Sequence, residues 1–425
     1  MNYEQLKSYI LRDEINEVLR QIKGTDDLEN EKKRYLKLLD EAYDRFGDGD
    51  YHFISSPGRT EIGGNHTDHQ HGHVVAASLN MDNVCIVKAS GDNICTFSDP
   101  KHKDALINLE NLEVKENEKN TSISLLRGVA SRVQELGYKI GGFRALSDSE
   151  VLVGSGISSS ACYEVMLVEV FNTLFNEGKI TSVERAVISQ YAENVYFGKP
   201  CGLLDQLAIS VGGFVAVDFK NPNNPDIESF DFDFADYGYD LVLVNTKGDH
   251  SNLSHEYAAV PEEIKEVANF MGVDVLRDGD ADYFFSHIKE IREAVKNDRA
   301  VLRSLHFYNE DRRAVEQKLA IARKDIDGLL ALMNESGKSS YMYLQNVYPA
   351  SRPSGQSLAV GLAMSEYILG KNGAYRVHGG GFEGTIQAIV PHDSLENYKI
   401  VISSVFGDDA IMVLKIRPFG TKTVI

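Results

Sequence analysis

The sequence lacks the features of a disulfide-bonded, secreted or membrane-spanning protein. Its 425 residues include only four cysteines, and none of them forms a CxxC pair, so we expect buried free thiols rather than disulfides or a zinc site. No stretch approaches the roughly 20 consecutive apolar residues that a membrane-spanning helix needs. Residues 1–14 mix charged and apolar side chains and contain no signal-peptide core. These absences predict a soluble, cytoplasmic protein.

Positive charge is also scarce. Lysine and arginine together number 44 against 63 aspartates and glutamates, which gives a net charge of -19. A strongly acidic surface repels nucleic acids and anionic lipids, so neither is expected as a partner. This balance does not exclude ATP, because a nucleotide site needs only local donors and a metal. The length and the hydrophobic content of 43% predict a sizeable core and two or three domains.

Three common nucleotide-binding patterns are missing. A dinucleotide fingerprint starting at Gly154 would need glycine at position 159, where Ser159 stands. A P-loop ending in Lys338-Ser339 would need glycine at position 332, where Leu332 stands. The H-R-D and D-F-G motifs of protein kinases are absent as well. The sequence therefore excludes three familiar classes of nucleotide-binding protein.

Apolar periodicity predicts helices and strands in alternation, which indicates the α/β class (or α+β). An Asn- and Pro-rich segment at 221–225 favours a domain division there, giving an N-terminal domain of 1–225 and a C-terminal domain of 226–425. Residues 1–48 are expected to form two helices, broken at 24–27 and of unknown role. The expected strands are 51–55, 74–77, 84–89, 241–244 and 385–390. Besides the two N-terminal helices, the expected helices are 124–137, 165–178, 181–197, 256–272, 288–305, 311–334 and 357–370.

A glycine- and serine-rich loop precedes one of these helices. It reads Gly154-Ser-Gly-Ile-Ser-Ser-Ser160. Glycines allow backbone amides to approach an anion closely, and the helix that follows adds unpaired N–H donors and a positive dipole end. The pattern favours a triphosphate site, although an ordinary strand–turn–helix junction with serine caps would look the same.

A second segment, Ser56–Asp68, concentrates polar side chains between glycines. Arg59 offers planar donors suited to phosphate, and Asp68 can accept hydrogen bonds from a diol. Four histidines, at positions 66, 69, 71 and 73, crowd its end. A transition-metal site is conceivable there, but no cysteine or carboxylate pattern completes it, so solvated histidines are expected.

Two further segments carry candidate site residues. Asp205 lies among apolar residues, and a buried carboxylate needs either a partner or a function, so it is a candidate base or a partner of Arg59. Glu193 precedes it on a predicted helix and is a candidate magnesium ligand. The glycine cluster of His378–Gly384 permits close backbone approach to a ligand or to another loop.

Together the four segments resemble the galactokinase branch of the GHMP small-molecule kinases, in the family's order and from about residue 51 onward. The family patterns P-G-R-V-N-L-I-G-E-H-T-D-Y, G-G-G-L-S-S-S-A, M-P-C-G-x-x-D-Q and T-G-G-G-F-G-G are matched by Pro57–His69, Gly154–Ala161, Lys199–Gln206 and His378–Gly384. The resemblance implies a two-domain GHMP-kinase-like fold with the active site between the domains. It also implies a sugar-1-kinase that uses ATP and Mg²⁺ to phosphorylate the anomeric hydroxyl of galactose.

The resemblance also implies roles for individual residues. Asp205 would take or orient the proton of the anomeric hydroxyl, either as a true base or only as an electrostatic guide, and Arg59 would stabilise the charge that develops during transfer. The residues expected to hold the ligands are, for the phosphates, Gly154, Ser155, Gly156, Ile157, Ser158, Ser159 and Ser160; for Mg²⁺, Ser160 and Glu193; and for the sugar, Asn65, His66, Asp68, Gly202 and Tyr257.

Some positions depart from the family pattern. Asn65 replaces a glutamate that contacts the sugar's 6-hydroxyl, Glu61 replaces an asparagine, and Glu383 replaces a glycine. Because an amide at position 65 does not repel a carboxylate at C6, a galacturonate 1-kinase is the alternative interpretation. A sensor that binds sugar and ATP without catalysis is a third, disfavoured by the intact phosphate loop and Asp205. The oligomeric state stays open, and a monomer is compatible with the sequence.

Overall fold

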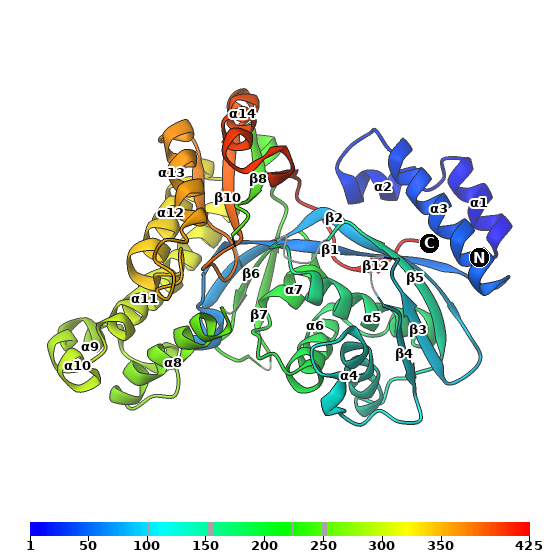
Figure 1. Cartoon of the computed structure of the whole chain (residues 1–425), viewed down its shortest axis with the longest axis horizontal. Coiled ribbons are helices and arrows are strands. Elements are labelled where there is room, and N and C mark those ends of the chain that lie inside the picture. The colour runs from blue at the N-terminus through cyan, green and yellow to red at the C-terminus, as the bar shows by residue number, and fades with distance from the viewer. Residues whose placement is uncertain (101–102, 152–155, 223, 249–252) are drawn as a thin grey trace.

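Two β-sheets organise the chain, which the computed structural model describes except for residues 101–102, 152–155, 223 and 249–252 (Figure 1). An eight-stranded sheet has the order β12-β1-β2-β5-β3-β4, with β6 on β2 and β7 on β6; a four-stranded sheet has the order β11-β8-β10-β9. All pairs are antiparallel except β3 with β5. The strands are β1 (His52–Gly63), β2 (His73–Ala89), β3 (Ile94–Ser98), β4 (Ala105–Asn108), β5 (Phe143–Ser149), β6 (Phe214–Asp218), β7 (Asp226–Phe230), β8 (Tyr239–Asn245), β9 (Ala374–Val377), β10 (Thr385–Pro391), β11 (Ile411–Leu414) and β12 (Lys422–Thr423).

Helices cover the sheets in layers. The N-terminal helices α1–α3 lie on one face of the large sheet and α4–α7 on the other (Figure 1). The small sheet packs against α12 on one face and against α13 and α14 on the other. The α-helices are α1 (Tyr3–Leu11), α2 (Asn16–Lys23), α3 (Glu29–Phe46), α4 (Ser122–Glu135), α5 (Ser159–Phe175), α6 (Ser182–Tyr191), α7 (Leu204–Val211), α8 (Ser254–Phe270), α9 (Ala281–Ser286), α10 (Ile288–Val295), α11 (Asp298–Arg323), α12 (Ile326–Ser339), α13 (Ser357–Leu369) and α14 (Leu395–Phe406).

The alternation of side chains along the strands explains the layers of the large sheet. Phe53 and Ile86 point to the α1–α3 side, whereas their neighbours Ile54 and Val87 point to the α4–α6 side. Both faces of β1 and β2 are therefore covered and largely buried, and the α/β (α+β) class expected from the sequence is confirmed. Within the described residues, no helix combines the length and the apolar character needed to cross a bilayer.

Strand β1 corrects the prediction for the second segment. We expected a strand over 51–55 followed by a loop, but β1 continues to Gly63. The sequence after residue 55 was misleading because Pro57 and the three glycines that follow it are typical of a loop. The register against β2 shifts between Pro57 and Arg59, and a proline is tolerated inside a sheet at such a bulge.

Several other boundaries also differ. Residues 1–48 form three helices instead of two, because the chain breaks a second time at Asp13, which has a positive φ of 64°. The predicted strands 74–77 and 84–89 are parts of the single strand β2, and β4 was not among the predicted strands. The predicted helices 288–305 and 311–334 are divided differently, as α10, α11 and α12.

The domain division after residue 225 stays a prediction. Strand β7, which follows it, still pairs with β6 in the large sheet, and the small sheet begins with β8. Near the end of the sequence, the chain returns to the large sheet through β12, which pairs with β1.

A buried ionic network fixes the N-terminal helices to the large sheet. Asp82 in β2 is completely buried, and its carboxylate lies 3.2 Å from Nζ of Lys23, 2.8 Å from Nη1 of Arg34 and 3.7 Å from Nη1 of Arg417. Ser55 in β1 donates a hydrogen bond to the same carboxylate. One acid thus joins α2, α3, the sheet and the segment before β12.

Candidate active site

The four sequence segments meet in one pocket of about 930 Å³. Its lining comes from the end of β1 and the turn after it, the start of α5, the segment before α7, and the loop between β9 and β10. The lining therefore draws on both the 1–225 and the 226–425 parts of the chain. A volume near the upper end of the range for small-molecule sites leaves room for a nucleotide and a second substrate.

The phosphate-loop candidate leads directly into helix α5. Gly154 and Ser155 lie outside the described residues, whereas Gly156, Ser158, Ser159 and Ser160 line the pocket. Ser158 is the N-cap residue with a positive φ of 64°, so the chain turns sharply before the helix. The free N–H groups of the first turn of α5 then provide an anion site.

One expected phosphate-loop residue does not face the pocket. The side chain of Ile157 is fully buried in the hydrophobic core, and its carbonyl accepts a hydrogen bond from the backbone N–H of Arg59 at 3.2 Å. The prediction for Ile157 therefore concerns at most its backbone. In the structure, its side chain anchors the loop to β1.

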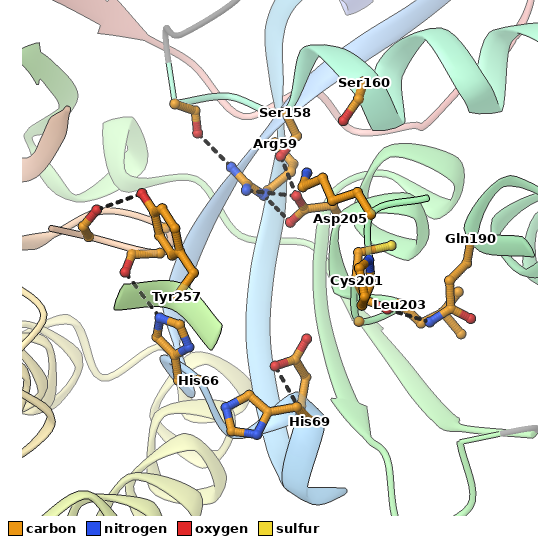
Figure 2. A pocket seen from close by; sticks show the side chains of 18 of the residues that line it. Arg59, His66, His69, Ser158, Ser160, Gln190, Cys201, Leu203, Asp205 and Tyr257 are labelled. Atoms are coloured by element: carbon orange, nitrogen blue, oxygen red, sulfur yellow. Dashed lines mark hydrogen bonds and ion pairs between the residues drawn. The ribbon is translucent and has the colours of Figure 1, made fainter. Parts of the chain in front are cut away.

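Arg59 and Asp205 form an ion pair inside the pocket. Nε of Arg59 donates to Oδ1 of Asp205, and Nη2 donates to Oδ2 at 2.9 Å. Ser158 also donates to Oδ2, and Nη1 of Arg59 donates to the carbonyl of Gly156 at 2.7 Å. Figure 2 shows Arg59, Ser158 and Asp205 turned toward one another. The fold thus brings the predicted pair together beside the phosphate loop.

The pair keeps Asp205 ionised. Burial alone would raise the pKa of Asp205, but the charge and hydrogen bonds of Arg59, with the Ser158 hydroxyl, hold that pKa below its usual value. A carboxylate has about four acceptor positions, and one position on Oδ1 is left for a substrate hydroxyl. This geometry suits an acceptor that orients a hydroxyl group and bears negative charge at neutral pH.

The side chains of Ser160 and Glu193 place oxygen atoms close together. Glu193 lies on a π-helical turn, Ala192–Phe197, and is 2% exposed. Its Oε1 accepts from the Ser160 hydroxyl at 3.2 Å, and its Oε2 accepts from Nε2 of Gln206 at 2.9 Å. A hydroxyl and a carboxylate beside a phosphate site form the kind of hard, oxygen-only donor set that Mg²⁺ prefers, so these residues fit that ion.

The expected sugar-binding residues lie around the other end of the pocket. Nε2 of His66 lies 3.1 Å from the carbonyl of Gly380, and the Tyr257 hydroxyl donates to the carbonyl of Gly381 at 2.9 Å (Figure 2). A Cβ at position 202 would lie 1.8 Å from Oδ2 of Asp68, so only glycine lets that segment approach the carboxylate.

Burial shifts the pKa values of the titratable groups at this end. It lowers the pKa of His66 to about 4 and that of His69 to about 3, so both imidazoles are neutral at pH 7. Burial, assisted by the charge of Asp205, raises the pKa of Asp68 to about 6. Asp68 therefore titrates near neutral pH, whereas the two histidines do not.

Asn65 is committed to a buried hydrogen-bond network. It is 1% exposed, and its Nδ2 donates to Oε1 of Glu61 at 3.0 Å and to the carbonyl of Gly379 at 2.7 Å. Its Oδ1 accepts from Asn346 at 2.9 Å and from Ser340 at 3.3 Å. Both amide hydrogens are therefore used by the protein, and neither is free for a substrate carboxylate.

The remaining predictions concern histidines and cysteines. Among the described residues, no group of three or more His, Cys, Asp or Glu side chains is arranged to hold a metal ion. His73 instead lies between two acids, 3.1 Å from Asp218 and 2.9 Å from Asp311. All four cysteines are free thiols, and three are buried as expected, whereas Cys201 lines the pocket.

Three residues of this region were missed by the sequence analysis. Gln206 shares its Nε2 between Glu193 and the fully buried Glu164 (3.2 Å), and Nζ of Lys199 lies 3.0 Å from Oε1 of Glu193. The position of Glu164, one helical turn after Ser160, was a usable signal. A second signal was that Lys199 stands at the methionine of the M-P-C-G pattern.

Two sequence families match parts of the chain that contain these segments. The family described as "Galactokinase galactose-binding signature" matches residues 43–89, which include Arg59 and Asp68. The family described as "GHMP kinases N terminal domain" matches residues 124–213, which include the phosphate loop, Glu193 and Asp205.

Curated proteins are similar over most of the chain. A galactokinase of Glaesserella parasuis serovar 5 (strain SH0165) is 29% identical over 362 residues, which are 84% of this chain and 90% of that protein. A galactokinase of Clostridium tetani (strain Massachusetts / E88) is 25% identical over 376 residues, which are 88% of this chain and 91% of that protein.

Solved structures share the fold. The crystal structure of Lactococcus lactis galactokinase complexed with galactose aligns with a TM-score of 0.78 at 22% identity, covering 90% of this chain and 98% of that one. The Methanococcus jannaschii mevalonate kinase aligns with a TM-score of 0.61 at 13% identity, covering 87% and 99%. At these identities the likeness concerns the fold alone, and it confirms the two-domain GHMP-kinase architecture.

Proposed function

Because the chain belongs to the galactokinase branch of the GHMP kinases, we propose that it transfers the γ-phosphoryl group of ATP to the anomeric hydroxyl of galactose. One observation carries this proposal. In the pocket, the Arg59–Asp205 pair lies between the N-terminus of helix α5, which can bind an anion, and the end of the pocket that contains Asp68. A phosphate site and a hydroxyl-binding site that meet at a paired carboxylate suit phosphoryl transfer to an alcohol.

In this reaction the anomeric oxygen attacks the γ-phosphorus, and the bond to the oxygen that bridges the β- and γ-phosphates breaks. ADP leaves, and the proton of the anomeric hydroxyl passes either to the carboxylate of Asp205 or directly to solvent. The carboxylate of Asp205 accepts the hydrogen bond of that hydroxyl and aligns its oxygen, while Arg59 stabilises the negative charge at the transferring group. Such positioning and electrostatic stabilisation supply most of the catalysis in phosphoryl transfer.

The remaining residues hold the substrates. The backbone of the phosphate loop through Ser160 holds the triphosphate, and His66, Asp68, Gly202 and Tyr257 bind the sugar hydroxyls. Ser160 and Glu193 hold Mg²⁺, which when bound neutralises charge on the phosphate oxygens. Asn65 acts indirectly, because its amide supports the Gly379 carbonyl at the wall of the pocket.

The hydrogen bonds of Asn65 favour galactose over galacturonate as the proposed substrate. The galacturonate hypothesis needs Asn65 to donate a hydrogen bond to a carboxylate at C6, and both of its amide hydrogens are already engaged. Of the charged side chains that line the pocket beside Asn65, the acids Glu61 and Asp68 would repel an acid at C6. The cations Arg59 and Lys199 are paired with Asp205 and Glu193.

A coupled assay of ADP release with MgATP and a panel of sugars tests the proposed function. We expect turnover with galactose and little or none with galacturonate, glucose or mevalonate. Turnover with galacturonate alone would transfer the function to a uronic acid kinase. Binding of ATP and galactose without turnover would support a sensor instead.

The KM for galactose should rise as the pH falls below about 6. The reason is that the pKa of Asp68 is about 6, so its carboxylate gains a proton in this range and loses acceptor capacity toward the sugar. The sign follows from the raised pKa: the binding form is present above about pH 6 and is lost below it. A pH series of KM from pH 5 to 8 checks this.

Asp68→Asn is the matched control for this dependence. It should have a raised KM that no longer changes between pH 5 and 7, because the amide does not titrate. A slope in KM that persists in the variant would assign the titration to another group.

A further inference from the structure

Lys199 reaches the oxygen atoms that the proposed function assigns to the metal. Its Nζ lies 3.0 Å from Oε1 of Glu193, and the same oxygen accepts the hydrogen bond of Ser160 at 3.2 Å. We propose that the ammonium group of Lys199 is a tethered cation that competes with the divalent metal for Glu193. This inference rests on the proposed function, because it takes Ser160 and Glu193 as the metal ligands.

Glu193 needs a positive partner when no metal is present. Glu193 is 2% exposed as a whole residue, and removing a charge from water is costly unless that charge is paired. The other side chains that contact it among the described residues, those of Gln206, Ser160 and Cys201, are neutral. The neighbouring cation, Arg59, is already paired with Asp205 and bonded to the Gly156 carbonyl. Lys199 therefore supplies the positive charge at Glu193.

The ion pair between Lys199 and Glu193 can be broken easily. The side chain of Lys199 is 59% exposed, in contrast to 3% for that of Glu193, so the lysine can leave its partner without opening the core. Two cations at one carboxylate oxygen repel each other, so a metal that binds Oε1 displaces the ammonium group. Since Lys199 also lines the pocket with Arg59 and the phosphate loop, the displaced charge stays near the triphosphate.

Removal of this competitor should strengthen metal binding. With the full-length protein and a non-hydrolysable ATP analogue, Mn²⁺ binding is followed by the electron paramagnetic resonance signal of the free ion, which needs no turnover. We expect Lys199→Met to bind Mn²⁺ about fivefold more tightly than wild type, because the metal no longer has to break an ion pair whose lysine is exposed to solvent. The apparent Mg²⁺ requirement for turnover should fall in the same proportion.

Two further variants separate competition from a general charge effect. Lys199→Arg keeps the positive charge and should keep Mn²⁺ affinity within twofold of wild type. Lys220→Met removes one positive charge from an exposed lysine outside the pocket lining and should also leave it within twofold. Equal tightening in Lys220→Met would mean that net charge, rather than Lys199, sets the affinity.

The proposal is overturned if Lys199→Met binds Mn²⁺ with unchanged or weaker affinity. Weaker binding would show that the lysine assists the metal–nucleotide complex. Failure of the proposed function is distinguishable, because a wild-type protein that binds Mn²⁺ and the analogue but does not phosphorylate galactose refutes the activity. The effect of Lys199 on Mn²⁺ would still be measured in such a protein.

Discussion

Asp205→Asn should lower kcat with galactose by about 10³-fold, a loss in the range that positioned proton acceptors and electrostatic groups contribute. The substitution removes the negative charge that we propose aligns the anomeric hydroxyl, and it leaves Arg59 without its bidentate partner. Steady-state kinetics with saturating MgATP and galactose measure the loss. Calorimetric binding of a non-hydrolysable ATP analogue should stay within several-fold of wild type, which separates lost catalysis from lost folding.

Ser158→Ala is the matched control, since it removes one hydrogen bond to the same carboxylate and keeps the charge. Its kcat should fall less than tenfold. An Asp205→Asn variant that keeps more than a tenth of wild-type kcat would contradict the assignment of Asp205. Because Arg59 holds the pKa of Asp205 low, the acid limb of the wild-type profile should arise from Asp68.

Asp82→Asn should lower the free energy of unfolding of the large sheet by about 3–5 kcal/mol, the typical cost of breaking a buried ionic network. The variant would leave Lys23, Arg34 and Arg417 without the carboxylate that joins them, and Arg417 is itself fully buried. Urea denaturation followed by circular dichroism measures the change. The Arg59–Asp205 site is not part of this network, so the folded fraction should keep its activity.

Asp148→Asn is the control for this prediction. Asp148 also pairs with Arg34, with Nε to Oδ2 at 2.9 Å, but its side chain is 43% exposed, so the expected loss is below about 1 kcal/mol. Equal losses in the two variants would contradict the importance of burial.

The pH dependence of stability provides a second test of Asp82. Burial opposes ionisation, but the surrounding cations hold the pKa of Asp82 well below its usual value. For a lowered pKa, the stabilisation is complete above the unfolded pKa of about 4 and is lost only as the pH falls through the folded value. The network should therefore persist into mildly acidic solution in wild type.

The chemistry of the site was predictable where it is encoded locally. The phosphate loop is recognisable because glycines, serines and the following helix are adjacent in sequence, and Asp205 is recognisable as an acid among apolar residues. The fold class followed from apolar periodicity in the same way. Strand β1 did not, because the bulge that accommodates Pro57 is set by its pairing with β2.

Properties that depend on distant residues were not predictable. The role of Asn65 is decided by Asn346 and Gly379, which lie in the other half of the sequence, so the sequence alone could not show that its amide is fully used. The same holds for Asp82, whose partners are at both ends of the chain. Lys199 departs visibly from the methionine of the M-P-C-G pattern, but its contact with Glu193 depends on the fold and could not be seen in the sequence.

During translation of this chain, β12 pairs with β1 late. Strand β1 leaves the ribosome early, but its edge is completed only when Lys422–Thr423 are made, and Phe53 then exchanges hydrogen bonds with Val424 and Ile425. Until then β1 is the edge strand on that side of the large sheet, and its unpaired backbone groups can bind other chains. We expect nascent chains that stop before β12 to associate with chaperones, and ribosomes that pause before the codon of Lys422 to increase misassembly.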